Sequence, residues 1–247
     1  MKRRNEAGVT LIELLISVTL VALLSTGMLL AIRAGTRTME KSNEQLVANR
    51  RAASVERILE EQVAGIMPVK AKCTPGPDNP AQTVLFFQGD SNSMRFASSY
   101  SLQQANRGLP MILEYSVIAG ENGEGVRLVV NERLYTGPLS TGSLCAGLTP
   151  DPATGAMIPQ FVPIQISASS LVLADKLAYC RLSYRLVPRQ ELHLPPVWLP
   201  HWQNPLLPSA IRVEMAPLRA NAARVQPMSL SLPIHVTRDP MKMDYGY

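Results

Sequence analysis

The sequence lacks the patterns that carry common enzyme chemistry. It has no nucleophile elbow, no glycine-rich loop to cradle phosphate, no His-Glu-x-x-His pair and no pair of acids placed for acid–base work. Its histidines are scattered: His193 and His201 lie eight residues apart in an expected loop, and His235 stands alone. We interpret them as solvated or satisfied side chains. We therefore expect no enzymatic activity, no cofactor and no metal site.

Cysteine is also scarce, with only Cys73, Cys145 and Cys180 in 247 residues. There is no Cys-x-x-Cys pair, which argues against zinc. If the domain is exported to an oxidising compartment, one disulfide and one leftover thiol are expected. The sequence leaves all three pairings open. We lean to Cys73–Cys145, because both lie in Pro/Gly-rich loops while Cys180 lies in an expected strand.

Charge of either sign is low. The net charge is +5, of which residues 1–8 contribute +2, leaving +3 for the rest of the chain. That is too weak to predict nucleic acid binding from charge alone. A possible basic area, which we interpret first as a solvated strand face, comprises Arg181, Arg185, Arg189 and Arg212.

One long segment lacks charge altogether. From Leu14 to Ile32 there is no charged side chain and no proline. A helix of this length would reach roughly 28 Å, close to the hydrocarbon thickness of a bilayer. A short basic leader with Lys2, Arg3 and Arg4 precedes it. Glu13 stands inside the hydrophobic block, and since a carboxylate there costs about 2.5–3.5 kcal/mol, we expect it to have a specific partner.

Three simpler interpretations explain fewer of these N-terminal features. A secretory signal peptide should end in a small-x-small site, but the nearest candidate, residues 25–27, lies inside the apolar run. An uncleaved signal anchor explains the basic leader but neither Gly8 nor Glu13. A buried soluble helix explains neither the leader nor the length.

The stretch Gly8-Val9-Thr10-Leu11-Ile12-Glu13-Leu14-Leu15 with its apolar helix resembles the class III signal of type IV prepilins and type II secretion pseudopilins. The resemblance implies that a membrane-embedded prepilin peptidase cleaves between Gly8 and Val9 and methylates the new amine of Val9. The family usually has Phe where this chain has Val9. Glu13 would be the fifth residue of the mature chain, and the resemblance implies that it acts in methylation and subunit docking. A carboxylate in the first helical turn also suits the helix dipole, and a neighbouring subunit's amine would offset its desolvation.

The helical pattern continues beyond Ile32 to about residue 66, without proline until Pro68. Apolar residues recur there at steps of three and four and form one stripe that predicts packing against a globular domain: Ala48, Ala52, Val55, Leu59, Val63 and Ile66. We divide the chain into a leader (1–8), a membrane or filament-core half-helix (9–32), an amphipathic half-helix (33–67), a β-rich domain (68–236) and a tail (237–247).

The rest of the chain predicts antiparallel strands, giving an α+β fold with the helix laid on one sheet face. We expect Thr83–Gln88 to pair with Ser93–Tyr100, and Met111–Ala119 to form a hairpin with Val126–Tyr135. Further strands are expected at Ile164–Ser167, Leu171–Ala174, Leu177–Val187, Ala210–Met215 and Ser229–Val236. The last should lie at a sheet edge, because Pro233 lacks a donor.

Two loops stand out. Residues 136–163 form a Pro/Gly/Ser/Thr-rich stretch that we interpret as an insertion or Ω-like loop. The acidic turn at residues 120–125 invites a calcium interpretation, but its two glutamates fall short of a ligand set, so a solvated turn is the better interpretation.

The C-terminal half resembles J-type minor pseudopilins, and the size and N-terminal helix are shared with W-type minor pilins. The similarity comprises Tyr179 and Tyr184, then Trp198 and Trp202, then residues 207–215. Two interpretations of these tryptophans stay open: they cover the core as a lid, or they contact a neighbouring subunit.

Two functions from different classes follow. The first is a structural subunit of a tip complex that primes a secretion pseudopilus or type IV pilus. It would be anchored in the bacterial inner membrane with its C-terminal domain in the periplasm. Its partners would be the prepilin peptidase, other minor and major subunits and the assembly platform. The alternative is a tip module that binds a surface, a secreted substrate or DNA. The sequence does not distinguish a pseudopilus, a retractile pilus and a DNA-uptake filament.

Overall fold

The computed structural model describes residues 10–74, 80–103, 106–151, 155–186, 195–218 and 227–236. The expected leader, Val9, Arg189, His193 and the expected tail therefore lie outside the described residues. The chain divides into two compact units, Met1–Asn49 and Arg50–Tyr247, and each is considered by itself.

A single helix, α1 (Leu11–Ala64), opens the described chain. Gly65 follows as a turn and β1 (Ile66–Met67) begins at once, so the helix ends two residues before the expected limit. Neither glycine inside the helix, Gly27 or Gly35, interrupts it. The segment without proline is therefore helical almost to its end.

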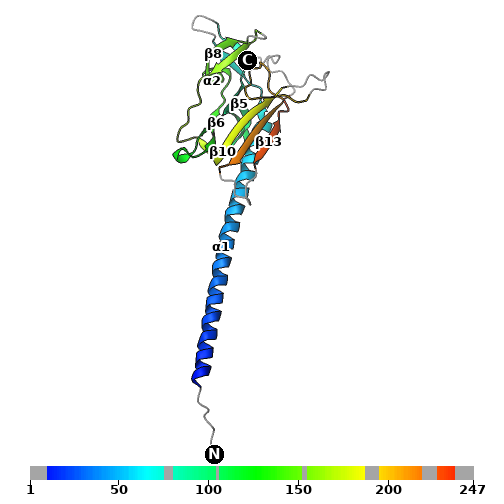
Figure 1. Cartoon of the computed structure of the whole chain (residues 1–247). Coiled ribbons are helices and arrows are strands. Elements are labelled where there is room, and N and C mark those ends of the chain that lie inside the picture. Colours follow the sequence, from blue (N-terminus) through cyan, green and yellow to red (C-terminus); the bar gives the residue numbers. More distant parts are fainter. Residues whose placement is uncertain are drawn as a thin grey trace, which may run out of the picture. The chain divides into compact units, whose positions relative to one another are not determined.

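An antiparallel sheet of nine strands forms the centre of the second unit (Figure 1). Its main path runs β1-β5-β6-β7-β10-β12-β13, with β4 also pairing with β5 and β11 with β10. The other strands are β4 (Gln88–Gly89), β5 (Ser93–Ser101), β6 (Asn106–Ala119), β7 (Val126–Leu134), β10 (Leu171–Arg185), β11 (Trp198–Leu199), β12 (Ala210–Pro217) and β13 (Met228–Pro233). The α+β prediction is thus confirmed.

The helical stripe packs on one face of this sheet. Val55, Leu59 and Val63 of α1 are buried, and Ile66 continues the stripe at β1. They join a core to which almost every strand of the sheet contributes. Ala52 is half-buried, and the side chain of Ala48 lies outside the described ones. The spacing of the stripe therefore predicted correctly which side of this helix meets the sheet.

A second layer covers part of the opposite face. It contains two small two-stranded sheets and a short helix: β2 (Lys70–Cys73) with β3 (Gln82–Leu85), β8 (Cys145–Pro150) with β9 (Met157–Phe161), and α2 (Pro138–Gly142). Their apolar side chains form a second core with Ala97 and Ile112 of the large sheet. The interpretation of residues 136–163 as an Ω-like loop was wrong, since α2, β8 and β9 all lie in that stretch and build this layer.

A disulfide joins the two small sheets. It links Cys73 of β2 to Cys145 of β8, with their Cα atoms 5.7 Å apart. This is the pairing towards which we leaned from the sequence. The bond closes a loop across a sequence separation of 72 residues. A loop of this length corresponds to about 4 kcal/mol of stabilisation in the chain-entropy treatment. Cys180 is a buried free thiol in β10, and burial raises its pKa to about 12.

Several strand predictions need correction. Thr83–Gln88 does not pair as one strand with β5: β3 pairs with β2, and only Gln88–Gly89 pairs with β5. Ile164–Ser167 forms no strand and instead crosses the sheet, where Asn131 Nδ2 donates to the carbonyl of Gln165 at 2.9 Å. The two strands expected between Leu171 and Val187 are one strand, β10, with register shifts before Leu177.

Other predictions hold. The β6–β7 hairpin forms in a continuous register from Met111 opposite Leu134 to Ala119 opposite Val126. The last strand, β13, lies at the end of the sheet order, as expected from Pro233.

Candidate functional site

The first turn of α1 is built by Thr10 and Glu13. The Thr10 carbonyl accepts the backbone N–H groups of Glu13 and Leu14 at 3.1 and 3.2 Å, and the Glu13 N–H also approaches Thr10 Oγ1 at 3.4 Å. Threonine followed three residues later by glutamate is the capping-box pattern, which satisfies otherwise unpaired N–H groups at a helix start. Sequence reasoning assigned Thr10 no role of its own, although this spacing could have identified it.

Side chains along the first part of α1 are all exposed. From Thr10 to Asn43 no described side chain is even half-buried. Large apolar side chains are exposed too: Leu11 is 86% exposed and Leu24 is 73% exposed. Leu11–Asn43 is long and apolar enough to cross a membrane. Because exposed apolar area costs about 25 cal/mol per Å² in water, this surface requires lipid or other apolar helices around it.

Hydroxyl groups within this segment are already satisfied. Ser17 and Thr19 donate to carbonyls three residues earlier, both at 2.9 Å. Ser25 and Thr26 donate to carbonyls four residues earlier, both at 2.8 Å. Since an unpaired polar group in hydrocarbon costs several kcal/mol, these back-bonds let the segment enter an apolar environment.

Glu13 differs from these hydroxyl-bearing residues. It is the only ionisable side chain in the described sequence from Thr10 to Ile32, it is exposed, and it has no ion-pair partner among the described residues. Gly8 and Val9, the residues of the expected cleavage site, lie outside the described residues. The site is therefore a capped helix start with a single carboxylate on an otherwise apolar, unburied surface.

Residues 3–29 match the family model described as the prokaryotic N-terminal methylation motif. The chain carries a prepilin-type methylation motif. The match supports the type IV pilin and pseudopilin family, whose motif is processed by prepilin peptidase and whose subunits assemble with other pilins. It also fits a membrane-anchored subunit with a structural, not an enzymatic, role. A search of curated proteins found no match to the chain.

The two tryptophans of the globular unit differ. Trp202 is 6% exposed, contacts the Tyr184 ring, and donates its Nε1 to the Leu206 carbonyl at 2.7 Å. This confirms the lid interpretation for Trp202. Trp198 is half-buried, and the guanidinium carbons of Arg212 and Arg185 lie 3.8 and 5.9 Å from its ring centre.

Other candidate polar groups do not converge on one site. His201 lies 3.3 Å from Asp90, and the turn residue Glu121 lies 3.4 Å from Arg127. Within the described ranges, no three His, Cys, Asp or Glu side chains come close enough to hold a metal ion.

Proposed function

We propose that the chain is a minor pilin or pseudopilin, a subunit of a tip complex that primes assembly of a type II secretion pseudopilus or type IV pilus. The observation that carries the proposal is the exposed apolar helix with Glu13 in its first turn, coinciding with the methylation motif. In this proposal prepilin peptidase cleaves between Gly8 and Val9 and methylates Val9. The β domain would lie in the periplasm.

The assembly step follows from the chemistry of the helix start. Cleavage would create an ammonium group on Val9, close in sequence to the Thr10 cap. In a bundle of like helices, the apolar side chains would become buried against neighbours in place of lipid. Glu13 would meet the amine of an adjacent subunit, and a charge pair formed in an apolar surrounding depends strongly on its geometry. This pair would therefore fix the axial register between subunits.

The size of the globular unit supports a minor subunit. Residues 68–236 hold a second layer over the sheet, and a chain of 247 residues is long for a major pilin. The order of Tyr179, Tyr184, Trp198 and Trp202 favours the J-type subfamily over the W-type one.

Glu13→Val tests the assembly role. The variant should still insert in the membrane, because removing a carboxylate improves partitioning by about 2.5–3.5 kcal/mol. It should assemble poorly, because the charge partner of the neighbouring amine is lost. Membrane fractionation and a sheared-filament or cross-linking assay measure the two properties separately.

Ser17→Val provides the matched control. It also removes a polar group in the next turn, but one that bonds only its own helix at Leu14, so both insertion and assembly should be retained. Full assembly by Glu13→Val would remove this account of Glu13.

A second candidate, a tip binding module for an acidic ligand, is favoured by the Arg185–Trp198–Arg212 face. Arg185 Nε is held by Ser209 Oγ at 2.9 Å, and the Arg212 guanidinium lies over the Trp198 ring, so both cations are positioned by the fold. The described ion pairs of the chain involve neither arginine.

Arg185→Gln/Arg212→Gln tests this candidate against short duplex DNA as the probe. Binding through these two cations should weaken with salt, and the double variant should reduce the slope of log affinity against log salt by about 2. Exposed Arg133→Gln serves as a control for a general charge effect. If the wild-type chain shows no salt-sensitive binding to the duplex, the proposal that DNA is the ligand loses its support.

A further inference from the structure

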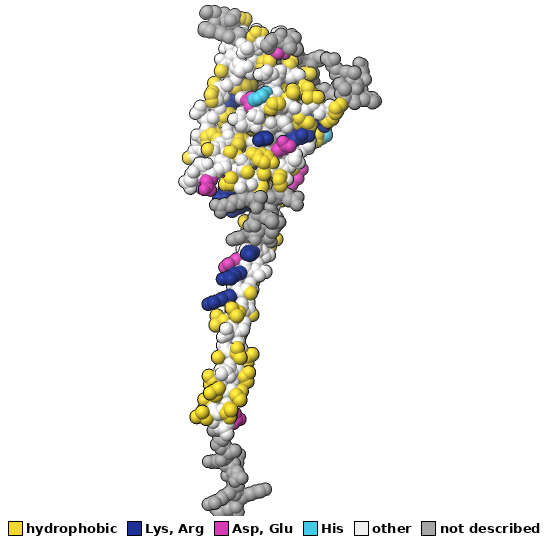
Figure 2. Space-filling view, viewed as in Figure 1, with side chains coloured by type: hydrophobic (Ala, Val, Ile, Leu, Met, Phe, Trp, Pro, Cys, Tyr) yellow, Lys and Arg dark blue, Asp and Glu magenta, His cyan; other side chains and the backbone are white. Residues whose placement is uncertain are grey.

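Two arginines follow the apolar run directly. Arg33 is the first charged residue after Glu13, and Arg37 follows one helical turn later. Both side chains are exposed. Figure 2 shows Lys and Arg side chains on one side of α1 just beyond its apolar part.

Their depth would match the lipid headgroups. Along a helix Arg33 lies about 1.5 Å and Arg37 about 7.5 Å beyond Ile32. The headgroup layer on each side of a bilayer is roughly 5–8 Å thick. The first acid after them, Glu40, lies about 12 Å beyond Ile32, outside that layer. The charges are thus ordered by depth, with cations level with the phosphates and the acid beyond them.

The two guanidinium groups are also free to take a ligand. Neither arginine forms an ion pair with another described residue. Residues four apart lie on nearly the same side of a helix, so Arg33 and Arg37 face one region of lipid. The Thr36 hydroxyl donates to the Arg33 carbonyl at 3.1 Å, so it does not occupy either guanidinium group. Guanidinium groups suit phosphate oxygens because they donate two parallel hydrogen bonds.

We propose that Arg33 and Arg37 form a binding site for the phosphates of lipid headgroups, with a preference for anionic phospholipids. The site rests on the proposed function in one respect, since it requires α1 to be inserted in a membrane. Each cation near an anionic surface strengthens the preference for anionic lipid by about fivefold. The pair would hold the subunit at a defined depth before it enters a filament, where these contacts must be given up.

The test measures lipid selectivity around the full chain. Wild-type protein is reconstituted in phosphatidylcholine vesicles that contain spin-labelled phosphatidylglycerol or spin-labelled phosphatidylcholine, and the motionally restricted fraction of each label is compared. We expect the wild type to prefer phosphatidylglycerol several-fold, and Arg33→Gln/Arg37→Gln to lose most of that preference. Arg33→Lys/Arg37→Lys should retain much of it, because the charge remains.

Arg50→Gln/Arg51→Gln is the matched control. It removes the same charge from exposed positions of the same helix, about 27 Å beyond Ile32, and should leave the preference unchanged. The leader is kept in every variant, so its lysine and arginines contribute equally. Equal selectivity in the wild type and Arg33→Gln/Arg37→Gln overturns the inference alone. A wild-type chain that alkaline carbonate extracts from the vesicles is not inserted, which overturns the proposed function and this inference with it.

Discussion

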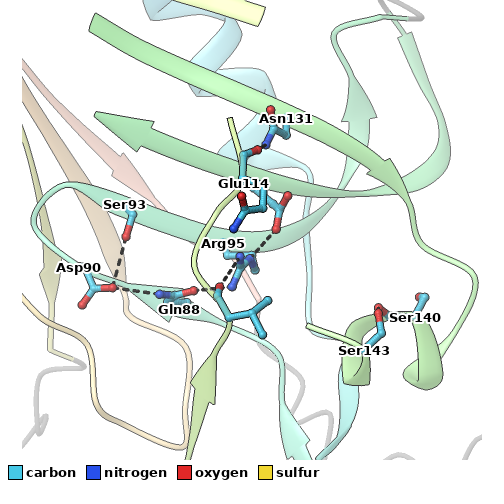
Figure 3. A network of polar contacts seen from close by, with 10 residues as sticks. Gln88, Asp90, Ser93, Arg95, Glu114, Asn131, Ser140 and Ser143 are labelled. Atoms are coloured by element: carbon cyan, nitrogen blue, oxygen red, sulfur yellow. Dashed lines mark hydrogen bonds and ion pairs between the residues drawn. The ribbon is translucent and has the colours of Figure 1, made fainter. Parts of the chain in front are cut away.

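Arg95→Met is expected to lower the free energy of unfolding by about 3–5 kcal/mol, the loss typical of breaking a buried ion pair. The Arg95 side chain is 0% exposed, and its Nε lies 2.8 Å from Glu114 Oε1, whose side chain is 5% exposed (Figure 3). Methionine fills a similar volume but leaves the Glu114 carboxylate without its cation. Urea unfolding of the full chain in detergent micelles, followed by Trp198 and Trp202 fluorescence, measures the change.

Arg95 also connects the two layers of the globular unit. It donates to Gln88 Oε1 at 2.8 Å and to the Val162 carbonyl at 3.0 Å, and its guanidinium carbon lies 5.5 Å from the centre of the Phe161 ring. Burial lowers the pKa of Arg95, and the neighbouring Glu114 carboxylate opposes that shift. An arginine remains protonated in proteins, so the pair stays ionic.

The double variant Arg95→Met/Glu114→Leu separates the two contributions. It removes the uncompensated charge, so it should be more stable than Arg95→Met alone. Arg57→Met, an exposed position of α1, should change stability by less than about 0.5 kcal/mol. If Arg95→Met and the double variant lost the same stability, the contacts of Arg95 to Val162 and Phe161 would account for the effect, and not the charge of Glu114.

The parts of the fold that the sequence predicted are those set by local periodicity. Val55, Leu59 and Val63 recur at helical spacing, and all three are buried on the sheet. The β6–β7 hairpin was visible because two alternating segments flank a short glycine-rich turn. Pro233 marked an edge strand because it cannot donate to a further neighbour.

The second layer was not predictable by the same means. It joins β2 and β3 to β8 and β9, which follow some 60 residues later, and the Cys73–Cys145 disulfide links them. No periodic pattern within either pair of strands predicts that it packs against the other pair. The role of Arg95 was missed for the same reason, because burial of both sheet faces arises only once this layer is in place. Ile164–Ser167 has strand-like composition but crosses the sheet without pairing, so tertiary context overrode its propensity.

The candidate site was more accessible to sequence reasoning, because it is contiguous. Glu13 stood out as a lone charge in an apolar run, and the run's length fixed a membrane-scale helix. The Thr10 cap was overlooked although its pattern with Glu13 is equally local. The positions of Arg33 and Arg37 become informative only when they are compared with the end of the apolar part of that helix.

Gly8→Leu is expected to leave the leader attached to the chain. In the proposed function the peptide bond between Gly8 and Val9 is cleaved, and a bulky side chain at Gly8 would obstruct the peptidase on that side of the bond. Intact mass and gel mobility of the membrane-extracted protein measure the result: the wild type should lack residues 1–8 and carry one methyl group on Val9, while the variant should retain the full leader and lack that methyl group.

Gly27→Leu is the matched control, since it places the same side chain at another glycine of the N-terminal region. Nothing lies within 4 Å of a Cβ built at Gly27, so the helix accommodates the substitution, and processing should be normal. Because both variants add one leucine near the same apolar segment, a general effect on membrane insertion would appear in both. Normal cleavage and methylation of Gly8→Leu would count against the motif, whereas failure of both variants would assign the defect to insertion and not to the cleavage site.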